Sequence, residues 1–238
     1  EFLSHNGVIN ESIVGTELGL KGIPYISESI NIFRDIQILS YSGGKLHIPY
    51  VNTNKGVELI REAKKRNLDI TASTSLAHVT FSDKDIANFN TNLKIIPPLR
   101  SEIDSKSIKE ALVDGTIDYL TSMHEPIDID NKKVVFDLAT PGSIGLESVF
   151  GIMCNNFTLE KTIDILTRNK SIFEIEDHPI KIGSHADLTL FNPDKSYEFS
   201  EEHILSTSKN CAFISTKMKG IVYGSINNNN STLNKLWI

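Results

Sequence analysis

The segment of this sequence best placed to carry chemistry is residues 121–126 (TSMHEP), which follows the strand-like run at 117–120 (IDYL). Such a run followed by a polar loop is typical of a buried parallel strand, and a barrel of alternating strands and helices places its catalytic groups in loops of this kind. The residue best placed to act in this loop is Met123. A thioether cannot take up a proton at neutral pH, and it is a poor ligand for a hard or borderline metal ion. The segment therefore looks like an active-site loop from which the acid has been removed.

Histidines and one glutamate are the other candidates for a reactive centre. His47 lies in a predicted strand and His124 at the end of another, so closure of a barrel could bring the two rings near each other. A metal needs three or four ligands that converge on one point, and the sequence has neither a His-x-His pair nor a His-Glu-x-x-His motif. We therefore interpret His47 as a half-buried strand residue and His124 as a loop residue with a backbone partner. Glu125 could titrate, but it has no paired base in the sequence.

Three further features have a chemical and a structural interpretation. Asp118 lies in a predicted strand, where an isolated aspartate is more often a hydrogen-bonding residue than a general base. Arg100 follows the stiff pair Pro97 and Pro98 and could face an anion, although an ion pair explains it equally well. Residues 140–145 (TPGSIG) precede a predicted helix and could offer backbone N–H groups to a ligand, but they lack the glycine spacing and the lysine of a phosphate-binding loop.

The elements that must position these groups alternate along the first 170 residues. Apolar spacing predicts helices and β-branched runs predict strands, with Ser101 and Thr158 as N-caps and with glycines at 43, 44 and 115 as helix ends. Strand, helix and strand in this order imply right-handed crossovers and a parallel sheet. Three strands cannot close a barrel, which needs eight. The predicted helices are 28–40, 54–67, 101–113, 145–154 and 158–168, and the predicted strands are 46–51, 70–75 and 117–122.

After Pro179 the pattern changes to short alternating runs bounded by turns, which predicts a small β module. We therefore divide the chain into residues 1–178 and residues 179–238. The polar run 227–230 is expected to be a loop or frayed. The predicted strands of the module are 180–183, 187–191, 197–199 and 221–226.

Composition narrows the possible functions. The chain has 238 residues with 39% hydrophobic and 23% charged side chains, as expected for a globular protein. Its formal net charge is −6 and it has no basic stripe, which argues against nucleic acid as a partner, and its apolar runs are too short to span a membrane. The two cysteines, Cys154 and Cys211, form no Cys-x-x-Cys pair, so we expect a reducing cytoplasm. Glu1 follows neither an initiator methionine nor a signal peptide, so we expect the gene product to begin earlier.

Several segments, in their order and spacing, resemble dihydroorotases of the cyclic amidohydrolase superfamily over nearly the whole chain. A later segment, 183–191 (GSHADLTLF), is similar to the Gly-x-x-Ala-Asp-Leu strand in the C-terminal β module of that superfamily, and 206–210 (STSKN) fits the dihydroorotase ending. The matching segments before these are 43–48 (GGKLHI), 56–64 (GVELIREAK), 97–102 (PPLRSE), 114–118 (DGTID) and 144–147 (IGLE).

The resemblance implies a (β/α)8 barrel with a small β-sandwich. This chain would hold strands six to eight of that barrel and the C-terminal part of the sandwich. The first five strands, with a His-x-His pair of metal ligands, would precede residue 1. Parallel strands need cover on both faces, so we expect the remaining part to belong to the same molecule or to come from another chain.

This sequence departs from the family pattern at the positions that carry its chemistry. The metal-binding histidine of strand six corresponds to Tyr50, and the substrate-binding asparagine before Pro-Pro-Leu-Arg corresponds to Ile96. The family's Asp-His-Ala-Pro-His corresponds to residues 123–127, so its metal-binding, catalytic aspartate becomes Met123 and its second histidine becomes Ile127. Gly142, which faces substrate in the family, is retained. A single base contributes about 10²–10⁴-fold to a rate, so losing it together with a ligand and two substrate contacts predicts loss of turnover.

Our leading hypothesis is a non-catalytic dihydroorotase-like protein of pyrimidine biosynthesis, without a cofactor and with a structural or assembly role. The resemblance implies aspartate carbamoyltransferase as a partner, and we also expect a homo-oligomer. The alternative is an active metal-dependent cyclic amidohydrolase that converts dihydroorotate to carbamoyl aspartate, using His124 or Glu125 and a zinc ion held by residues before Glu1. A third interpretation is a sensor that binds ligand without transforming it.

Overall fold

The computed structural model describes residues 3–176 and 179–233, which divide into two compact units. The first unit is residues 1–146 with 206–212, and the second is residues 147–205 with 213–238. The chain thus changes unit near residue 147, earlier than the boundary between 178 and 179 expected from composition. The reason is that the first helix after residue 147 packs against a later strand of the second unit and against the helix that follows it.

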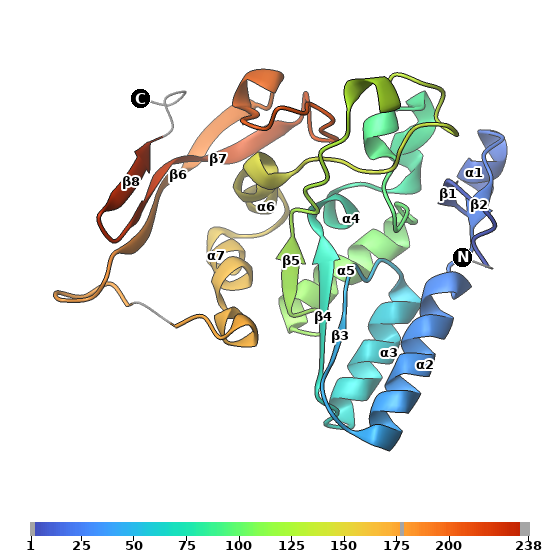
Figure 1. The fold of residues 1–238 in the computed structure, drawn as a ribbon, viewed down its shortest axis with the longest axis horizontal. Helices are drawn as coiled ribbons and strands as arrows, with labels where there is room; N and C mark the ends of the chain where they lie inside the picture. The colour runs from blue at the N-terminus through green and yellow to red at the C-terminus, as the bar shows by residue number, and fades with distance from the viewer. Residues whose placement is uncertain (1–2, 177–178, 234–238) are drawn as a thin grey trace. The chain divides into compact units, whose positions relative to one another are not determined.

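A parallel sheet of three strands, in the order β3-β4-β5, forms the centre of the first unit (Figure 1). These strands are β3 (Leu46–Ile48), β4 (Ile70–Ser75) and β5 (Tyr119–Thr121). In the register, His47 lies opposite Thr71 and Ser73 lies opposite Tyr119. The predicted parallel pairing of the strands is confirmed, although β3 and β5 are shorter than the predicted runs.

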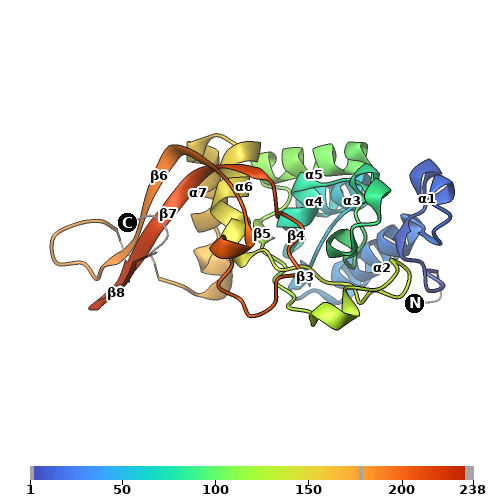
Figure 2. The same ribbon diagram turned by 90° about the horizontal axis from the view of Figure 1, so that it is seen from above.

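Long helices cover one side of this sheet: α2 (Ile26–Ser42), α3 (Asn54–Lys65) and α5 (Glu102–Asp114). Figure 2 shows α3 and α5 along the same side of the three strands, and α3 contacts both α2 and α5. The predicted apolar face of α3, which consists of Val57, Ile60 and Ala63, is fully buried. The spacing of three to four residues therefore identified the side of α3 that packs inward.

Local sequence signals set the helix ends. Ser101 and Asp104 form a capping box at the start of α5, where each side chain accepts a hydrogen bond from the backbone of the other residue. Gly115 ends α5 with a φ of 83°, and Gly43 ends α2 with a φ of 68°, both as predicted. Thr53, which was not predicted to cap, accepts a hydrogen bond from Gly56 N at the start of α3.

Short elements complete the first unit. A two-stranded parallel sheet pairs β1 with β2, and the turn of α1 contacts one of the short 3-10 helices. The elements are β1 (Ile9–Asn10), α1 (Ile13–Glu17), β2 (Gly22–Ile23), α4 (Leu76–Thr80) and the 3-10 helices Asp83–Asn88, Thr91–Leu93 and Ile129–Asn131.

An antiparallel sheet in the order β6-β7-β8 forms the second unit together with two helices, α6 and α7. Figure 1 shows α6 beside β7, and the two elements are in contact. The described residues of this unit form one sheet, and the sandwich, of which this chain was expected to hold only the C-terminal part, stays a prediction. The elements are β6 (Asp187–Glu198), β7 (Lys217–Asn227), β8 (Asn230–Leu233), α6 (Val149–Asn156), α7 (Leu159–Thr167) and the 3-10 helices Leu146–Ser148, Lys170–Phe173 and Glu201–His203.

Two predictions in the β module need correction, and a third, the loop within 227–230, is confirmed. Residues 180–183 form a bend and turn rather than a strand, and Ile180 and Ile182 are fully or almost fully exposed, so their alternation marks no buried face. The predicted strands 187–191 and 197–199 are one strand, with an irregular register between Asn192 and Ser196. The polar run 227–230 contains the tight turn between β7 and β8, where Asn228 has a φ of 51°.

Both predicted helices of this unit are confirmed, with Thr158 accepting a hydrogen bond from Lys161 N as the N-cap of α7. No helix in the described part of the chain is long and apolar enough to cross a membrane.

Candidate functional site

The carboxyl ends of β3 and β5 lead into residues with an unusual backbone. Tyr50, just after β3, has a φ of 52°, and Met123, just after β5, has a φ of 48°. Side chains other than glycine seldom adopt this left-handed conformation, and Asn, Asp and His do so most readily. A tyrosine and a methionine are therefore out of place here, whereas the backbone shape suits a histidine or an aspartate.

The loop after Met123 pairs with the segment that carries Gly142. His124 forms an isolated parallel bridge with Ser143, and Glu125 N donates to Ser143 O at 2.9 Å. Met123 itself is 6% exposed, so its thioether fills space in the interior of the first unit. Met123 is thus part of the packed interior of the first unit.

Gly142 lies against two residues of that loop. Its φ is 137°, and a Cβ built on it would lie 2.9 Å from Ile127 Cγ1 and 3.2 Å from Glu125 Cβ. Its N–H donates to Lys94 O at 2.8 Å. The structure therefore brings Gly142 and Ile127 together, and only a glycine fits at position 142 without a shift.

Asn210 holds the two segments together, a role that the sequence did not reveal. Its Nδ2 donates to Glu125 O at 2.9 Å and to Gly142 O at 3.2 Å, while its Oδ1 accepts from Ile127 N at 3.1 Å. The side chain is 2% exposed, and a buried amide that satisfies its donors and its acceptor fixes the atoms around it. The only signal in the sequence was the fit of 206–210 to the family ending.

Glu125 is the titratable group closest to Gly142. Burial raises the pKa of its carboxyl, while the charge of Lys132 acts in the opposite direction. A partly buried carboxyl with a raised pKa is a candidate general acid or base. By contrast, Ile96 is 54% exposed, so its side chain shapes the surface rather than the interior.

His47 and His124 have the ordinary roles expected for them. His47 is half-buried, with Nδ1 2.9 Å from Thr71 Oγ1 and Nε2 3.1 Å from Ser73 Oγ and 3.0 Å from Tyr119 OH. Burial lowers the pKa of its ring, which favours the neutral form. His124 Nδ1 accepts from Leu146 N at 3.3 Å, a backbone partner as predicted.

Asp118 and Arg100 are also structural. Asp118 accepts from Lys64 Nζ at 2.8 and 2.9 Å and from Ala72 N at 2.7 Å, as expected for a hydrogen-bonding strand residue. Arg100 is 4% exposed and donates to Asn10 Oδ1 at 2.9 Å and to a backbone carbonyl of β2. Its guanidinium is therefore turned inward, and these hydrogen bonds favour the structural interpretation over the possibility that Arg100 faces an anion.

A metal ion does not fit the groups that this part of the chain supplies. Among residues 3–176 and 179–233, no three His, Cys, Asp or Glu side chains lie together as a ligand set. At the two strand ends, Tyr50 offers a phenol and Met123 a thioether. A zinc site needs three or four converging ligands, so these described residues do not supply a complete one.

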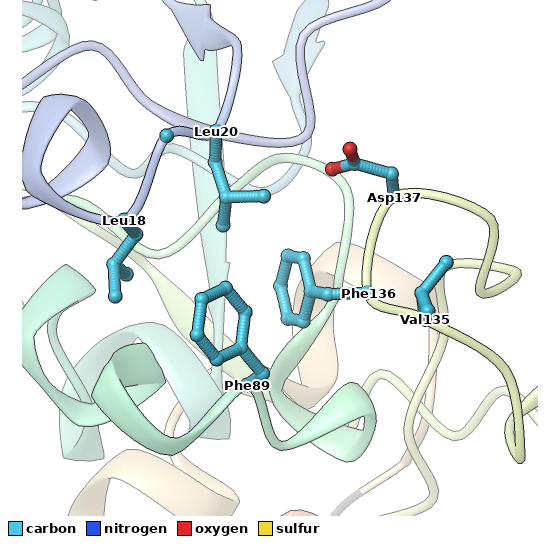
Figure 3. Close-up of a pocket in the computed structure, with 7 residues that line it drawn as sticks. Leu18, Leu20, Phe89, Val135, Phe136 and Asp137 are labelled. Carbon is cyan, nitrogen blue, oxygen red and sulfur yellow. The ribbon is translucent and has the colours of Figure 1, made fainter.

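A separate open cavity of about 330 Å³ lies in the first unit (Figure 3). The rings of Phe89 and Phe136 pack edge to face at 6.5 Å within it, and Asp137 contributes a carboxylate to its wall. None of the site positions predicted from the sequence lines it. The lining residues are Leu18, Gly19, Leu20, Phe89, Val135, Phe136 and Asp137.

Comparison with known proteins gives a consistent result. No protein-family model matches the chain. A dihydroorotase of Endomicrobium trichonymphae is 41% identical over 226 residues, which are 92% of this chain and 54% of that protein. In sequence, the chain is dihydroorotase-like. A dihydroorotase of Caldanaerobacter subterraneus is 37% identical over 227 residues, which are 92% of this chain and 52% of that protein. The chain thus spans about half the length of the curated relatives it matches.

Solved structures show the same fold. An L-hydantoinase (dihydropyrimidinase) from Arthrobacter aurescens superimposes with a TM-score of 0.81 over 96% of this chain and 56% of its own, at 21% identity. The inactive dihydroorotase-like domain of a Chaetomium thermophilum CAD-like multifunctional protein gives 0.58 over 83% of this chain and 53% of its own, at 17% identity. The predicted α/β fold is confirmed by these likenesses, and the complete barrel stays a prediction.

Proposed function

We propose that this chain is part of a dihydroorotase-like protein of pyrimidine biosynthesis that does not catalyse hydrolysis and serves a structural or assembly role. The observation that carries the proposal is the pair of left-handed residues, Tyr50 and Met123, at the ends of β3 and β5. The backbone at both places suits a histidine or an aspartate, whereas the side chains present are a phenol and a thioether.

Amide hydrolysis in this fold needs a metal-bound hydroxide and a base that moves its proton. Met123 has no proton acceptor for that task, and the alkyl side chain of Ile127, which lies against Gly142, offers no hydrogen bond to a substrate. Ile96 likewise replaces an amide with an alkyl group. Loss of a ligand alone could be compensated, but loss of the base and two substrate contacts as well leaves little of the reaction's machinery.

An assembly role has two supports. A solved structure of the same fold is described as the inactive dihydroorotase-like domain of a CAD-like multifunctional protein, so this fold occurs elsewhere without activity. In addition, the sheet carries a polar group of side chains around the buried Ser73, and its members His47, Thr71 and Tyr119 are only partly covered by the described residues. We propose that the rest of the protein or a second chain covers this polar group, and that aspartate carbamoyltransferase and a second copy of the protein are its partners.

A second candidate function is an active cyclic amidohydrolase with an altered site. The observation in its favour is the place of Glu125. Its side chain lies against Gly142, and burial raises the pKa of its carboxyl. In this alternative, residues outside this chain segment would hold a zinc ion and Glu125 or His124 would move the proton.

Hydrolysis of dihydroorotate by the purified full-length protein, with zinc or cobalt supplied, tests the two candidates. We expect no turnover above the rate without protein, and no stoichiometric metal by elemental analysis. Turnover that a chelator abolishes would refute the non-catalytic proposal. If Glu125→Gln then removes that turnover while the exposed control Asp128→Asn keeps it, the second candidate holds.

Binding measurements address the remaining alternatives. A thermal shift with dihydroorotate or carbamoyl aspartate, in the absence of turnover, would favour the sensor interpretation. Co-elution with aspartate carbamoyltransferase in size-exclusion chromatography is expected for the assembly role, and separate elution at micromolar concentrations contradicts that choice of partner.

A further inference from the structure

Two buried lysines hold the segment that follows the candidate site. Lys94 and Lys132 are each 4% exposed. Lys94 Nζ donates to Phe136 O and Asp137 O, both at 2.8 Å. Lys132 Nζ donates to a second pair of backbone carbonyls, Thr91 O at 2.8 Å and Thr140 O at 2.9 Å. Charged donors to carbonyl groups in a low-dielectric interior are strong, so this lysine pair fixes the path of the backbone around it.

The segment held in this way is residues 129–142, which connects two positions of the candidate site. It begins just after Ile127 and ends at Gly142, and Gly142 N also donates to Lys94 O at 2.8 Å. At its other side, Thr91 Oγ1 donates to Lys132 O at 2.8 Å. A change in the lysine pair therefore changes how firmly Gly142 is held.

The two ammonium groups are close enough to affect each other. Burial lowers the pKa of Lys132 to about 8, with a further lowering from the charge of Lys94 and an opposing effect of Glu125. Burial also lowers the pKa of Lys94, and the nearby carboxylate of Asp137 opposes that shift. At neutral pH, two positive charges are thus confined in one interior space with few negative charges to balance them.

We infer that the lysine pair makes residues 129–142 a pH-sensitive segment, held less firmly while both lysines are protonated and more firmly once Lys132 has released its proton to solvent. A neutral amine keeps two N–H donors, which are enough for Thr91 O and Thr140 O. Deprotonation therefore preserves both hydrogen bonds while it removes the repulsion with Lys94 and the cost of a buried charge. This change with pH in how firmly the segment is held would act on the loop that carries Gly142, whatever the function of the site.

Proton linkage determines whether opening of residues 129–142 becomes easier or harder as the pH rises. When the segment opens, Lys132 becomes hydrated and its pKa returns to the ordinary value of about 10.4. Between about pH 8 and pH 10.4, opening must therefore take up a proton, and it becomes harder as the pH rises. For a closed-state pKa of about 8, the opening equilibrium is about tenfold less favourable at pH 9 than at pH 7.

Amide hydrogen exchange of the protein at pH 7 and pH 9, corrected for the intrinsic rate at each pH, measures this opening. We expect the protection of residues 129–142 to rise about tenfold at pH 9. Lys132→Met removes the rise, whereas the neighbouring exposed control Lys133→Met keeps it. Lys94→Met moves the rise to higher pH, because Lys132 then has no adjacent positive charge.

Equal protection at the two pH values in the unmodified protein would overturn the inference, as would a rise that persists in Lys132→Met. If Lys132→Met does not fold, Lys132→Arg tests in its place whether the rise in protection depends on Lys132. Arginine stays charged at both pH values, so the rise must disappear in that variant as well.

Discussion

Replacement of Met123 by glycine and by alanine tests the left-handed backbone on which the proposed function rests. Met123 is 6% exposed and has a φ of 48°. Met153 is an internal control, since it is fully buried but lies in the right-handed backbone of α6. The two methionines differ in backbone conformation while sharing side-chain type and burial.

The expected magnitudes follow from burial and from backbone strain. Truncation of a buried methionine to alanine costs about 2–5 kcal/mol of unfolding free energy at either position. At Met123, glycine relieves about 1–2 kcal/mol of left-handed strain and adds about 0.5–1 kcal/mol of backbone entropy, so it should be better than alanine by about 1 kcal/mol. At Met153, glycine should be worse than alanine by about 1 kcal/mol, because no strain is relieved in a helix.

Urea denaturation of the four variants, followed by circular dichroism, measures the two differences in unfolding free energy. The comparison is valid if all variants keep the m-value of the unmodified protein. A Met123→Gly variant that is as unstable as Met123→Ala, or less stable, would refute the left-handed conformation. The argument that this position is shaped for a different residue would then lose its basis.

Two further predictions concern stability. His78 is 2% exposed and contacts Ser75 Oγ and Pro97 O, and burial lowers its pKa to about 4. Below pH 6.5 the unfolded chain therefore binds a proton that the folded protein does not, so about 3 kcal/mol of stability should be lost between pH 6.5 and pH 4. The urea midpoint of the unmodified protein should fall as the pH is lowered through this range, and it should fall less in His78→Gln. An equal dependence of the midpoint on pH in the two proteins would contradict the prediction. Ser101→Ala removes the capping box with Asp104 and should cost about 1–2 kcal/mol, which thermal or urea unfolding at pH 7 can check.

Where the controlling interactions are local, the sequence was a good guide to the fold. The face of α3 and the capping box of Ser101 depend on residues within one or two turns, so their spacing is visible in the chain. The run 180–183 shows the limit, because alternation over four residues does not ensure that a partner strand is present. Whether Asp187–Glu198 forms one strand or two likewise depends on the bulges in its pairing with β7.

The candidate site also has some features that the sequence reveals and others that only the structure reveals. Residue types at the strand ends, and therefore the absence of a proton acceptor at Met123, can be read directly from the sequence. The left-handed backbone of Met123 cannot be read from the sequence, since that conformation follows from how the loop after β5 packs. For Arg100 the sequence left an anion contact and a structural role open, and only its burial and its hydrogen bond to Asn10 favoured the structural role.

By itself the sequence determined the alternation of helices and strands, the dihydroorotase-like pattern, and the residue types Tyr50 and Met123 at the ends of two strands. Only the tertiary structure decided that Asn210 joins Glu125, Ile127 and Gly142 across as many as 85 residues, and that Lys94 and Lys132 share one interior space. The physical reason is that a residue's type and its near neighbours are fixed by the chain. Burial, hydrogen-bond partners and the charges felt by a side chain arise from segments that meet only on folding.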